Sequence, residues 1–413
     1  METKNSSRYH ENPYPNYVKG ETSNLFCIKD NDVIALNETL DKKIRQTVAR
    51  LVNDIDKEYE SSDKFHDLDH SVYVGTSGQA MFYFFYYLNT RNSKYLDKAQ
   101  RLIERALRRR RKRRFSFLNG DAGPLAISAL IYEALNKEEQ AKNSITELKA
   151  LAHHVIDLNS DTVDEILYGR AGYLYSLLFV NKNVKCTHVD GALIRQVVES
   201  ILKSGQALSA KKQSSIPLEY EWHEKNYYGA AHGVAGILFT LLKANAHLTD
   251  RERDTLVKPT LDALLKESLP SGNLKSSQGS SADRLVQWCH GCPGFVSLLE
   301  VAYEIYKDQS YLDSLLQSSD HVWKAGLLRK GYSLCHGVAG NAYSFLTVYH
   351  ATHNEEQLYR ALCFADWCTQ YNQHEEMVPD RPCSMYEGKA GLAFFLLDIL
   401  KPTNAKFPGY EDI

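Results

Sequence analysis

The sequence has no long apolar run and no apolar leader. Its most apolar aromatic stretch, Met81 to Leu88, is far shorter than the roughly eighteen residues that a membrane-spanning helix needs. Residues 1–17 lack the apolar core of a secretory signal peptide, and Glu2 follows Met1, which excludes N-myristoylation. We therefore expect no transmembrane segment and a cytoplasmic location, with peripheral membrane attachment or a nuclear location left open.

The chain also has almost no net charge. Its 49 Lys and Arg against 51 Asp and Glu leave −2, whereas nucleic-acid-binding domains are usually basic, so we expect no nucleic-acid partner. The exception is the run from Arg108 to Arg114, for which a phosphate-binding or nuclear-import patch and a solvated helix end are the alternatives. Because no secretion is expected, the eight cysteines are predicted to be reduced thiols or metal ligands.

Glycine is not abundant, but its arrangement is regular. The chain has 413 residues, 43% of them hydrophobic, which is typical of a globular protein. Fourteen of its 23 glycines form seven G-x-x-G pairs, at Gly75/Gly78, Gly120/Gly123, Gly169/Gly172, Gly233/Gly236, Gly291/Gly294, Gly337/Gly340 and Gly388/Gly391. The spacing between successive pairs is long enough for two helices and their loops, which indicates a repeat architecture.

Each glycine pair is followed by an apolar, aromatic-rich segment and preceded by a more charged amphipathic one. Helices that are apolar nearly all round are buried, and helices with one apolar stripe lie outside them. An open solenoid would need polar capping repeats, and the terminal repeats here are as apolar as the middle ones. We therefore predict an all-α fold, an α/α toroid of seven helical hairpins, as a single domain over residues 1–413 with residues 1–36 as an N-terminal arm.

In a closed toroid the seven turns would lie at one end, so residues far apart in sequence would share one site. Just before the first glycine, three repeats read Ala231-His232, Cys289-His290 and Cys335-His336. Thiolates together with imidazoles favour zinc. Four ligands would make a closed structural site, and three would leave a position open for catalysis. Adjacent residues rarely point the same way, which favours the three-ligand alternative.

Long motifs in matching order resemble the LanC-like family, the eukaryotic relatives of bacterial lanthionine cyclases. They are NPY near the N-terminus, NGDAGPLA (119–126), LYGRAGYLY (167–175), YYGAAHGVAG (227–236), QWCHGCPG (287–294), KGYSLCHGVAGNAY (330–343) and SMYEGKAG (384–391). The resemblance implies a seven-fold α/α toroid with one zinc ion. It also implies Cys289, Cys335 and His336 as the zinc ligands, with His290 not bound to the metal.

The resemblance further implies that glutathione thiolate is added to dehydroalanine or dehydrobutyrine in proteins or peptides. The addition produces an enolate that needs a proton, and His232 matches the family's position for the general acid; its other interpretation is a hydrogen-bonded turn residue. Glu165 lies near the family's inner acidic position, where it would orient His232 or deprotonate the thiol. Its alternative is a surface carboxylate at a helix start.

Glutathione carries two carboxylates, so cations are expected around it. Lys330 matches a glutathione-contacting lysine of animal relatives, and the segment Met377, Val378, Pro379 and Asp380 matches another contact. The relatives have arginine where this chain has Met377, which puts a side-chain salt link at this position in doubt. A backbone contact would survive the change.

We therefore predict a zinc-dependent glutathione transferase whose partners are glutathione and dehydroamino-acid-containing proteins or peptides. The main alternative is a non-catalytic scaffold or redox-signalling protein that binds glutathione and zinc and has signalling partners, because a fold does not establish an activity. Glycoside hydrolysis and prenyl transfer are weaker alternatives from other toroid proteins. A glycosidase would need two carboxylates at the mouth, and the turns offer no evident pair beside the Cys-His motifs.

Overall fold

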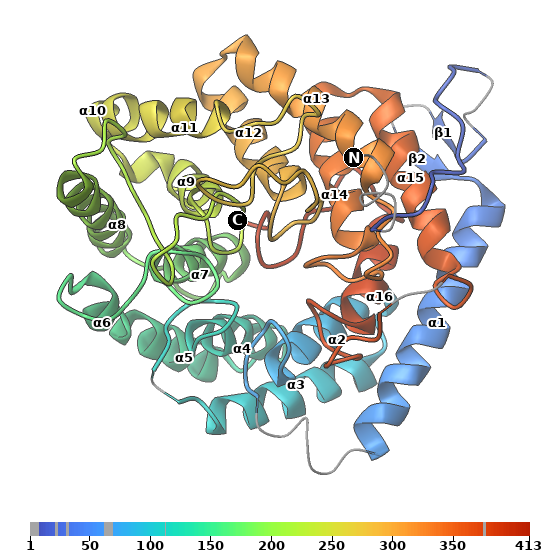
Figure 1. Ribbon diagram of the computed structural model, residues 1–413. Coiled ribbons are helices and arrows are strands. Elements are labelled where there is room, and N and C mark those ends of the chain that lie inside the picture. Colours follow the sequence, from blue (N-terminus) through green and yellow to red (C-terminus); the bar gives the residue numbers. More distant parts are fainter. Residues whose placement is uncertain (1–7, 21–23, 30–32, 62–68, 112, 375–376) are drawn as a thin grey trace. The chain divides into compact units, whose positions relative to one another are not determined.

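The computed structural model describes residues 8–20, 24–29, 33–61, 69–111, 113–374 and 377–413 (Figure 1). These residues are mostly helical. The strands β1 (Phe26–Lys29) and β2 (Val33–Leu36) form a two-stranded antiparallel sheet in which Phe26 pairs with Leu36. In the described part of the chain, no helix is long and apolar enough to cross a membrane.

Within the described residues, seven helices begin at the seven glycine pairs. They are α2 (Thr76–Thr90), α4 (Ala122–Ala134), α7 (Arg170–Asn183), α9 (Val234–Lys243), α12 (Cys292–Tyr306), α14 (Val338–Thr352) and α16 (Lys389–Asp398). Their side chains are largely buried, and α14 is buried without interruption from Val338 to Tyr349. This is the burial expected of helices that are apolar on every side.

Each of these helices has an amphipathic partner. The partners are α1 (Glu38–Ser61), α3 (Ser93–Arg108), α5 (Glu138–Ala150), α8 (Gly191–Lys212), α11 (Lys258–Leu265), α13 (Gln309–Ala325) and α15 (Glu355–Thr369). Five of them are preceded by an Asn or Asp whose side chain accepts a backbone N–H of the first turn, namely Asn37, Asn92, Asp190, Asp308 and Asn354. Such caps satisfy donors that the first helical turn leaves unpaired.

In the described residues, shorter helical segments also occur, one between α5 and α7 and three between α9 and α11. They are α6 (Ala152–Ile156), the 3-10 helix η2 (Asn245–His247), α10 (Asp250–Glu252) and the π-helical turn η3 (Arg253–Val257).

The second glycine of a pair is needed where the turn packs on its own helix. A Cβ atom at Gly340 would lie 1.8 Å from the carbonyl oxygen of Leu334, which is backbone and cannot rotate away. At one first glycine, Gly291, the reason is conformational, because its φ of 106° is one that L-residues rarely adopt. The glycines thus allow the residues just before each helix to fold back closely over its first turn.

The chain divides into two compact units, each of which contains inner and outer helices. The first comprises Met1–Phe65, Pro270–Asn273 and Asp283–Pro408, and the second His66–Leu269, Leu274–Ala282 and Gly409–Ile413. In the first unit α12 packs on α13, α14 on α15, and α16 on α1; in the second α2 packs on α3, α4 on α5, α7 on α8, and α9 on α11. The assignment of residues 1–413 to a single domain stays a prediction.

The described part of the N-terminal arm is anchored on the first unit. Tyr9 forms an isolated antiparallel bridge with Leu328, and the Asn12 side chain donates to the carbonyl of Trp323 at 2.8 Å. The Tyr14 hydroxyl donates to the Asp366 carboxylate at 2.9 Å. The arm therefore contacts segments of the chain more than 300 residues away from it in the sequence.

Candidate functional site

Two glycine turns of the first unit bring two thiols and an imidazole together. Cys289 lies in the turn before α12, and Cys335 and His336 lie in the turn before α14. Their three potential ligand atoms all lie within 4.8 Å of one another. Both cysteines are buried and His336 is partly exposed, so the cluster has a protected side and an accessible one.

Backbone hydrogen bonds connect these turns to each other and to a third. The Cys289 N–H donates to the Cys335 carbonyl at 3.3 Å, and the Cys335 N–H donates to the Tyr386 carbonyl at 2.9 Å. The Gln287 amide donates to the Cys289 sulfur at 3.0 Å. The sequence analysis missed Gln287, although it lies two residues before Cys289 in the quoted QWCHGCPG motif.

The electrostatic surroundings distinguish Cys289 from its neighbour Cys292. The hydrogen bond from Cys335 holds the pKa of the Cys289 thiol well below its usual value, although burial opposes this, and His336 adds to the effect. At Cys292 burial raises the pKa of the thiol, and its sulfur donates to the Ser318 carbonyl at 3.7 Å. Cys292 is therefore a packing residue, whereas Cys289 is placed to act as a thiolate.

The cluster fits a zinc ion by its donor set. Two thiolates and one imidazole are ligands that zinc prefers, and three protein ligands are typical of zinc sites that keep an open position. Among the described residues, His290 is not a member of this group. The geometry therefore supports the three-ligand alternative over the four-ligand one, and the metal itself stays a prediction.

A cavity of about 530 Å³ opens beside the cluster within the same unit. His336 lines it together with the residues that the sequence analysis assigned to glutathione, Lys330 and the segment Met377 to Asp380. Lys389, at the start of α16, is a second lysine in the wall, and its Nζ lies 2.9 Å from Asp54 Oδ2. The predicted ligand-binding residues thus share one pocket with one of the predicted metal ligands.

Part of the cavity wall is braced by an aromatic stack. Tyr332 lines the cavity, and its hydroxyl is hydrogen-bonded to Nδ1 of His374. The His374 ring lies 3.7 Å from that of Trp367 and nearly parallel to it, and His10 of the N-terminal arm packs against both rings. The arm thereby helps to fix the shape of the cavity.

The second unit contains the other predicted catalytic residues, and it pairs them. Nδ1 of His232, in the turn before α9, lies 3.1 Å from Oε2 of Glu165. Glu165 is only 2% exposed, and its carboxylate accepts the N–H groups of Leu167 and Tyr168. Burial raises the pKa of Glu165, although the hydrogen bond from His232 opposes the shift. The interpretation of Glu165 as a surface carboxylate is therefore wrong.

Two aromatic rings that the sequence analysis did not single out enclose the His232 imidazole. Trp222 is nearly parallel to it, at 6.0 Å between ring centroids and 9° between planes, and Tyr168 lies 5.9 Å away at 19°. Tyr168 occurs in the quoted LYGRAG motif. Trp222 lies outside the glycine repeats, so no sequence pattern indicated it.

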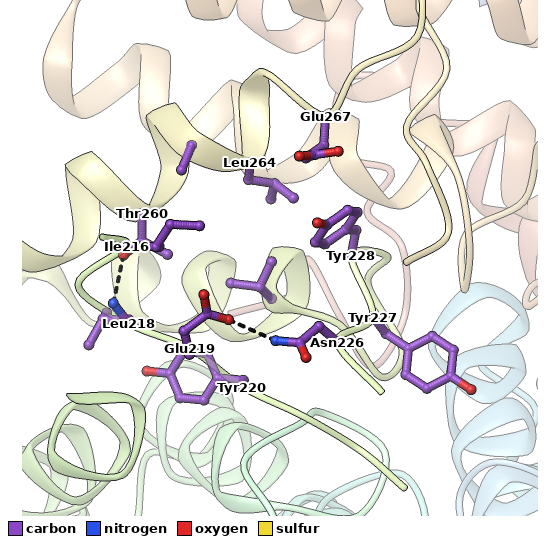
Figure 2. A pocket seen from close by; sticks show the side chains of 12 residues that line it. Ile216, Leu218, Glu219, Tyr220, Asn226, Tyr227, Tyr228, Thr260, Leu264 and Glu267 are labelled. Carbon is purple, nitrogen blue, oxygen red and sulfur yellow. Dashed lines mark hydrogen bonds between the residues drawn. The ribbon is translucent and has the colours of Figure 1, made fainter. Parts of the chain in front are cut away.

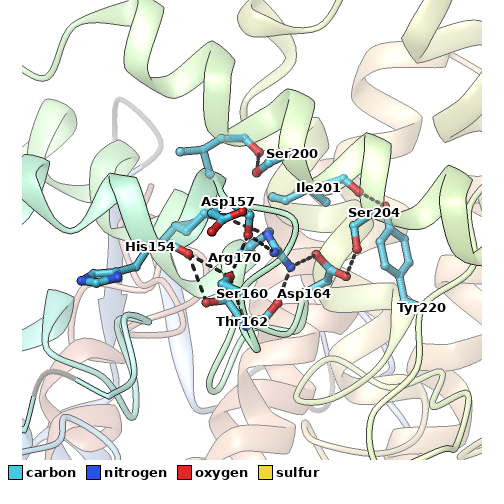
Figure 3. A network of polar contacts seen from close by, with 12 residues as sticks. His154, Asp157, Ser160, Thr162, Asp164, Arg170, Ser200, Ile201, Ser204 and Tyr220 are labelled. Atoms are coloured by element: carbon cyan, nitrogen blue, oxygen red, sulfur yellow. Dashed lines mark hydrogen bonds and ion pairs between the residues drawn. The ribbon is translucent and has the colours of Figure 1, made fainter.

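A buried arginine holds the segment that carries Glu165. Arg170 donates from Nε to the Val155 carbonyl at 2.8 Å and from Nη2 to the Asp157 carbonyl at 3.0 Å, and its Nη1 pairs with Asp164 at 3.1 Å (Figure 3). One guanidinium thus connects residues 155, 157 and 164, the last of which is the chain neighbour of Glu165.

A cavity elsewhere in the second unit is much smaller, at about 40 Å³ (Figure 2). Polar groups on its wall pair with one another, because the Asn226 amide donates to Glu219 at 2.7 Å and the Leu218 N–H donates to the Thr260 hydroxyl at 3.2 Å. This cavity is too small for a tripeptide such as glutathione.

Comparisons with known proteins found relatives of this chain. A family model described as lanthionine synthetase C-like protein matches residues 66–411. A protein of Danio rerio named Glutathione S-transferase LANCL1 is 39% identical over 404 residues, which cover 97% of this chain and 98% of that protein. Among solved structures, nisin cyclase is similar with a TM-score of 0.64 at 15% identity, over 90% of this chain and 96% of that one. The last likeness confirms the α/α-toroid fold class expected from the sequence.

Proposed function

Because the chain belongs to the lanthionine synthetase C-like family, we propose that it is a glutathione transferase. Its reaction is the zinc-dependent addition of glutathione thiolate to dehydroalanine or dehydrobutyrine residues of proteins or peptides. The name of the Danio rerio relative supports the transferase class. The observation that carries the proposal is the cavity in which Lys330 and the segment Met377 to Asp380 lie together with His336 of the thiol–imidazole cluster.

In this proposal Cys289, Cys335 and His336 hold the zinc ion, which when bound supplies the positive charge that keeps a substrate thiol deprotonated near neutral pH. The chain itself supplies the binding of glutathione. Lys330 and Lys389 line the cavity and are suited to the two carboxylates of the tripeptide. Met377 and Val378 are largely exposed, so their backbone is accessible to a ligand.

The reaction balances without a leaving group. The thiolate sulfur forms a bond to the β-carbon of the dehydroamino acid, and the electron pair of the carbon–carbon double bond moves onto the carbonyl to give an enolate. His232 donates a proton to the α-carbon, and solvent later restores it. Glu165 accepts a hydrogen bond from Nδ1, so it orients the imidazole ring and leaves Nε2 as the donor to substrate.

The test is a mass measurement on the purified full-length protein, with its zinc content determined in parallel. Incubation with glutathione and a peptide that contains dehydroalanine should give a peptide heavier by one glutathione, and a strong chelator should abolish the product. Restoring zinc should restore the product. If the protein binds glutathione and zinc but forms no zinc-dependent adduct, the scaffold alternative holds and the transferase proposal is wrong.

A further inference from the structure

Two cavities of the second unit meet at the basic segment between α3 and α4. One, of about 260 Å³, is lined by Arg111, Arg113 and Arg114, and the other, of about 240 Å³, shares Arg113 and Arg114. α3 ends at Arg108, so most of the basic run lies in the loop beyond the helix. Lys112, within the run, lies outside the described residues. The basic run, whose role the sequence left open, therefore lines two cavities.

The shared cations are linked to the His232–Glu165 pair through aromatic rings. The guanidinium carbon of Arg114 lies 4.2 Å from the centroid of the Tyr168 ring. Tyr168 in turn stacks on His232 and on Trp222. A ligand group held by Arg114 would therefore lie one aromatic ring away from the imidazole to which the proposed function assigns proton donation.

Asp69 and Asp121 line the larger cavity beside Arg113 and Arg114, and Asp161 lines the smaller one, but neither arginine is ion-paired in the described part of the chain. Arg110 of the same run, by contrast, pairs with Glu147 at 2.6 Å. A buried acid in the wall, Asp121, already accepts the Arg111 N–H at 3.2 Å. The two arginines are thus available to an external anion.

A buried histidine gives independent support. His70 lines the larger cavity and is 7% exposed. Its Nε2 lies 2.9 Å from Asp121 Oδ1, while its Nδ1 is buried without a hydrogen-bond partner in the described part of the chain. Buried polar atoms are usually satisfied, so this ring lacks an acceptor or donor that a bound ligand could provide.

We propose that these two cavities form a subsite for an anionic side chain of the polypeptide substrate, a carboxylate or a phosphorylated residue close to the reacting dehydroamino acid. Arginine is the residue best suited to both oxyanions, since its planar fork binds them through two parallel hydrogen bonds. Trp222 and Tyr168 in the wall offer flat apolar surface to the adjoining peptide. The inference rests on the proposed function, because it names the class of polypeptide that the transferase accepts.

The experiment measures binding without glutathione, so its result does not depend on turnover. Three fluorescent peptides differ at one position only, which carries phosphoserine, aspartate or serine. The neighbouring residue is a saturated alanine at the reacting position. Fluorescence anisotropy should show tighter binding of the two anionic peptides, and the double variant R113Q/R114Q should weaken them at least about tenfold. Arg108→Gln serves as the matched control, because Arg108 belongs to the same run but lines neither cavity.

The arms separate the possible sources of the anion. A much higher affinity for the phosphoserine peptide than for the aspartate peptide identifies a phosphate subsite. Equal affinities for these two peptides identify a general oxyanion subsite. Competition by inorganic phosphate supports either assignment. Equal affinity for all three peptides, or an equal loss in R108Q, overturns the inference even if glutathione transfer to dehydroalanine peptides is observed. Conversely, selective binding of the anionic peptides without glutathione transfer to dehydroalanine peptides would support the subsite and refute the proposed function.

Discussion

The turns before α14 and α9 have the same glycine spacing and a histidine at the same position, yet they are built for different chemistry. In the first, Cys335 and His336 meet Cys289 in a cluster of soft donor atoms. In the second, the residue before the histidine is Ala231, and His232 pairs with a buried carboxylate instead. The residue before the histidine is thus a thiol in a group of potential metal ligands in one turn and a methyl group in the other, where the histidine contacts a buried carboxylate.

The two regions also shift their titrating groups in opposite senses. Around Cys289, hydrogen bonds favour the charged thiolate and its pKa falls. At Glu165, burial dominates and the pKa of the carboxyl rises. The first environment suits a cation that stays in place, and the second suits a proton that moves during a reaction.

The largest effect is expected from removing a thiol of the cluster. Cys335→Ala should abolish stoichiometric zinc binding and lower adduct formation by at least about a hundredfold, because one of three ligands is lost. Elemental analysis and the mass assay measure both. Cys292→Ala is the matched control, since Cys292 is a buried cysteine three residues from Cys289 that takes no part in the cluster. Full zinc content in C335A would contradict the ligand assignment.

The next effect comes from substitutions of His232 and Glu165, which should lower activity without removing zinc. His232→Gln should lower kcat about a hundredfold, as expected for loss of a general acid, while zinc content and glutathione affinity stay at wild-type levels. Glu165→Gln should lower kcat less, by about tenfold, because the imidazole remains but loses its orienting carboxylate. Steady-state kinetics at saturating glutathione measure this. A variant that lost zinc together with activity would show that His232 acts through the cluster.

The regular part of the fold could be predicted because the glycine spacing reports a backbone requirement. A side chain at Gly340 would collide with the Leu334 carbonyl, so the residue type is dictated locally and is visible in the sequence. The same register predicted that Cys289 lies close to Cys335, since equivalent positions of neighbouring repeats lie side by side, and the cluster geometry agrees.

What could not be predicted depends on side chains from unrelated loops. Trp222 stacks on His232 although it lies outside any glycine turn, and no periodicity connects the two residues. The sequence also left open whether Glu165 points outward or inward. Two backbone N–H donors and the His232 ring decide that question, and all three partners depend on how the loop before α7 folds.

A smaller effect concerns the stability of the unit that carries His232. Arg195 binds both oxygens of Glu252, at 2.6 and 2.8 Å, and Glu252 also accepts the Thr249 N–H in a capping box. The Arg195 hydrogen bond lowers the pKa of Glu252 from 4.5 to about 2, although burial opposes it. A depressed carboxyl pKa stabilises the fold above the unfolded value and loses that contribution as the pH falls through the folded value.

Glu252→Gln should therefore lower the free energy of unfolding by about 1 kcal/mol at neutral pH, roughly fivefold in the equilibrium constant. The difference from wild type should shrink as the pH falls from 4.5 to about 2. Denaturant titrations at several pH values measure it. Glu199→Gln is the control, because Glu199 pairs with the same arginine through a more exposed contact. A loss of zinc in E252Q would show that the cluster of Cys289, Cys335 and His336 responds to a change in the unit that carries His232.

The smallest effect restores a charge to the cavity beside the metal cluster. Met377 is 66% exposed, so an arginine there can be accommodated without repacking and can reach a glutathione carboxylate in solvent. An exposed ion pair contributes little, and Met377→Arg should lower KM for glutathione by about two- to threefold with kcat unchanged. Val378→Arg, at a neighbouring position that is 82% exposed, tests whether added charge alone suffices. An equal gain in both variants would indicate general electrostatic attraction, whereas a gain in M377R alone would place a carboxylate of glutathione beside residue 377.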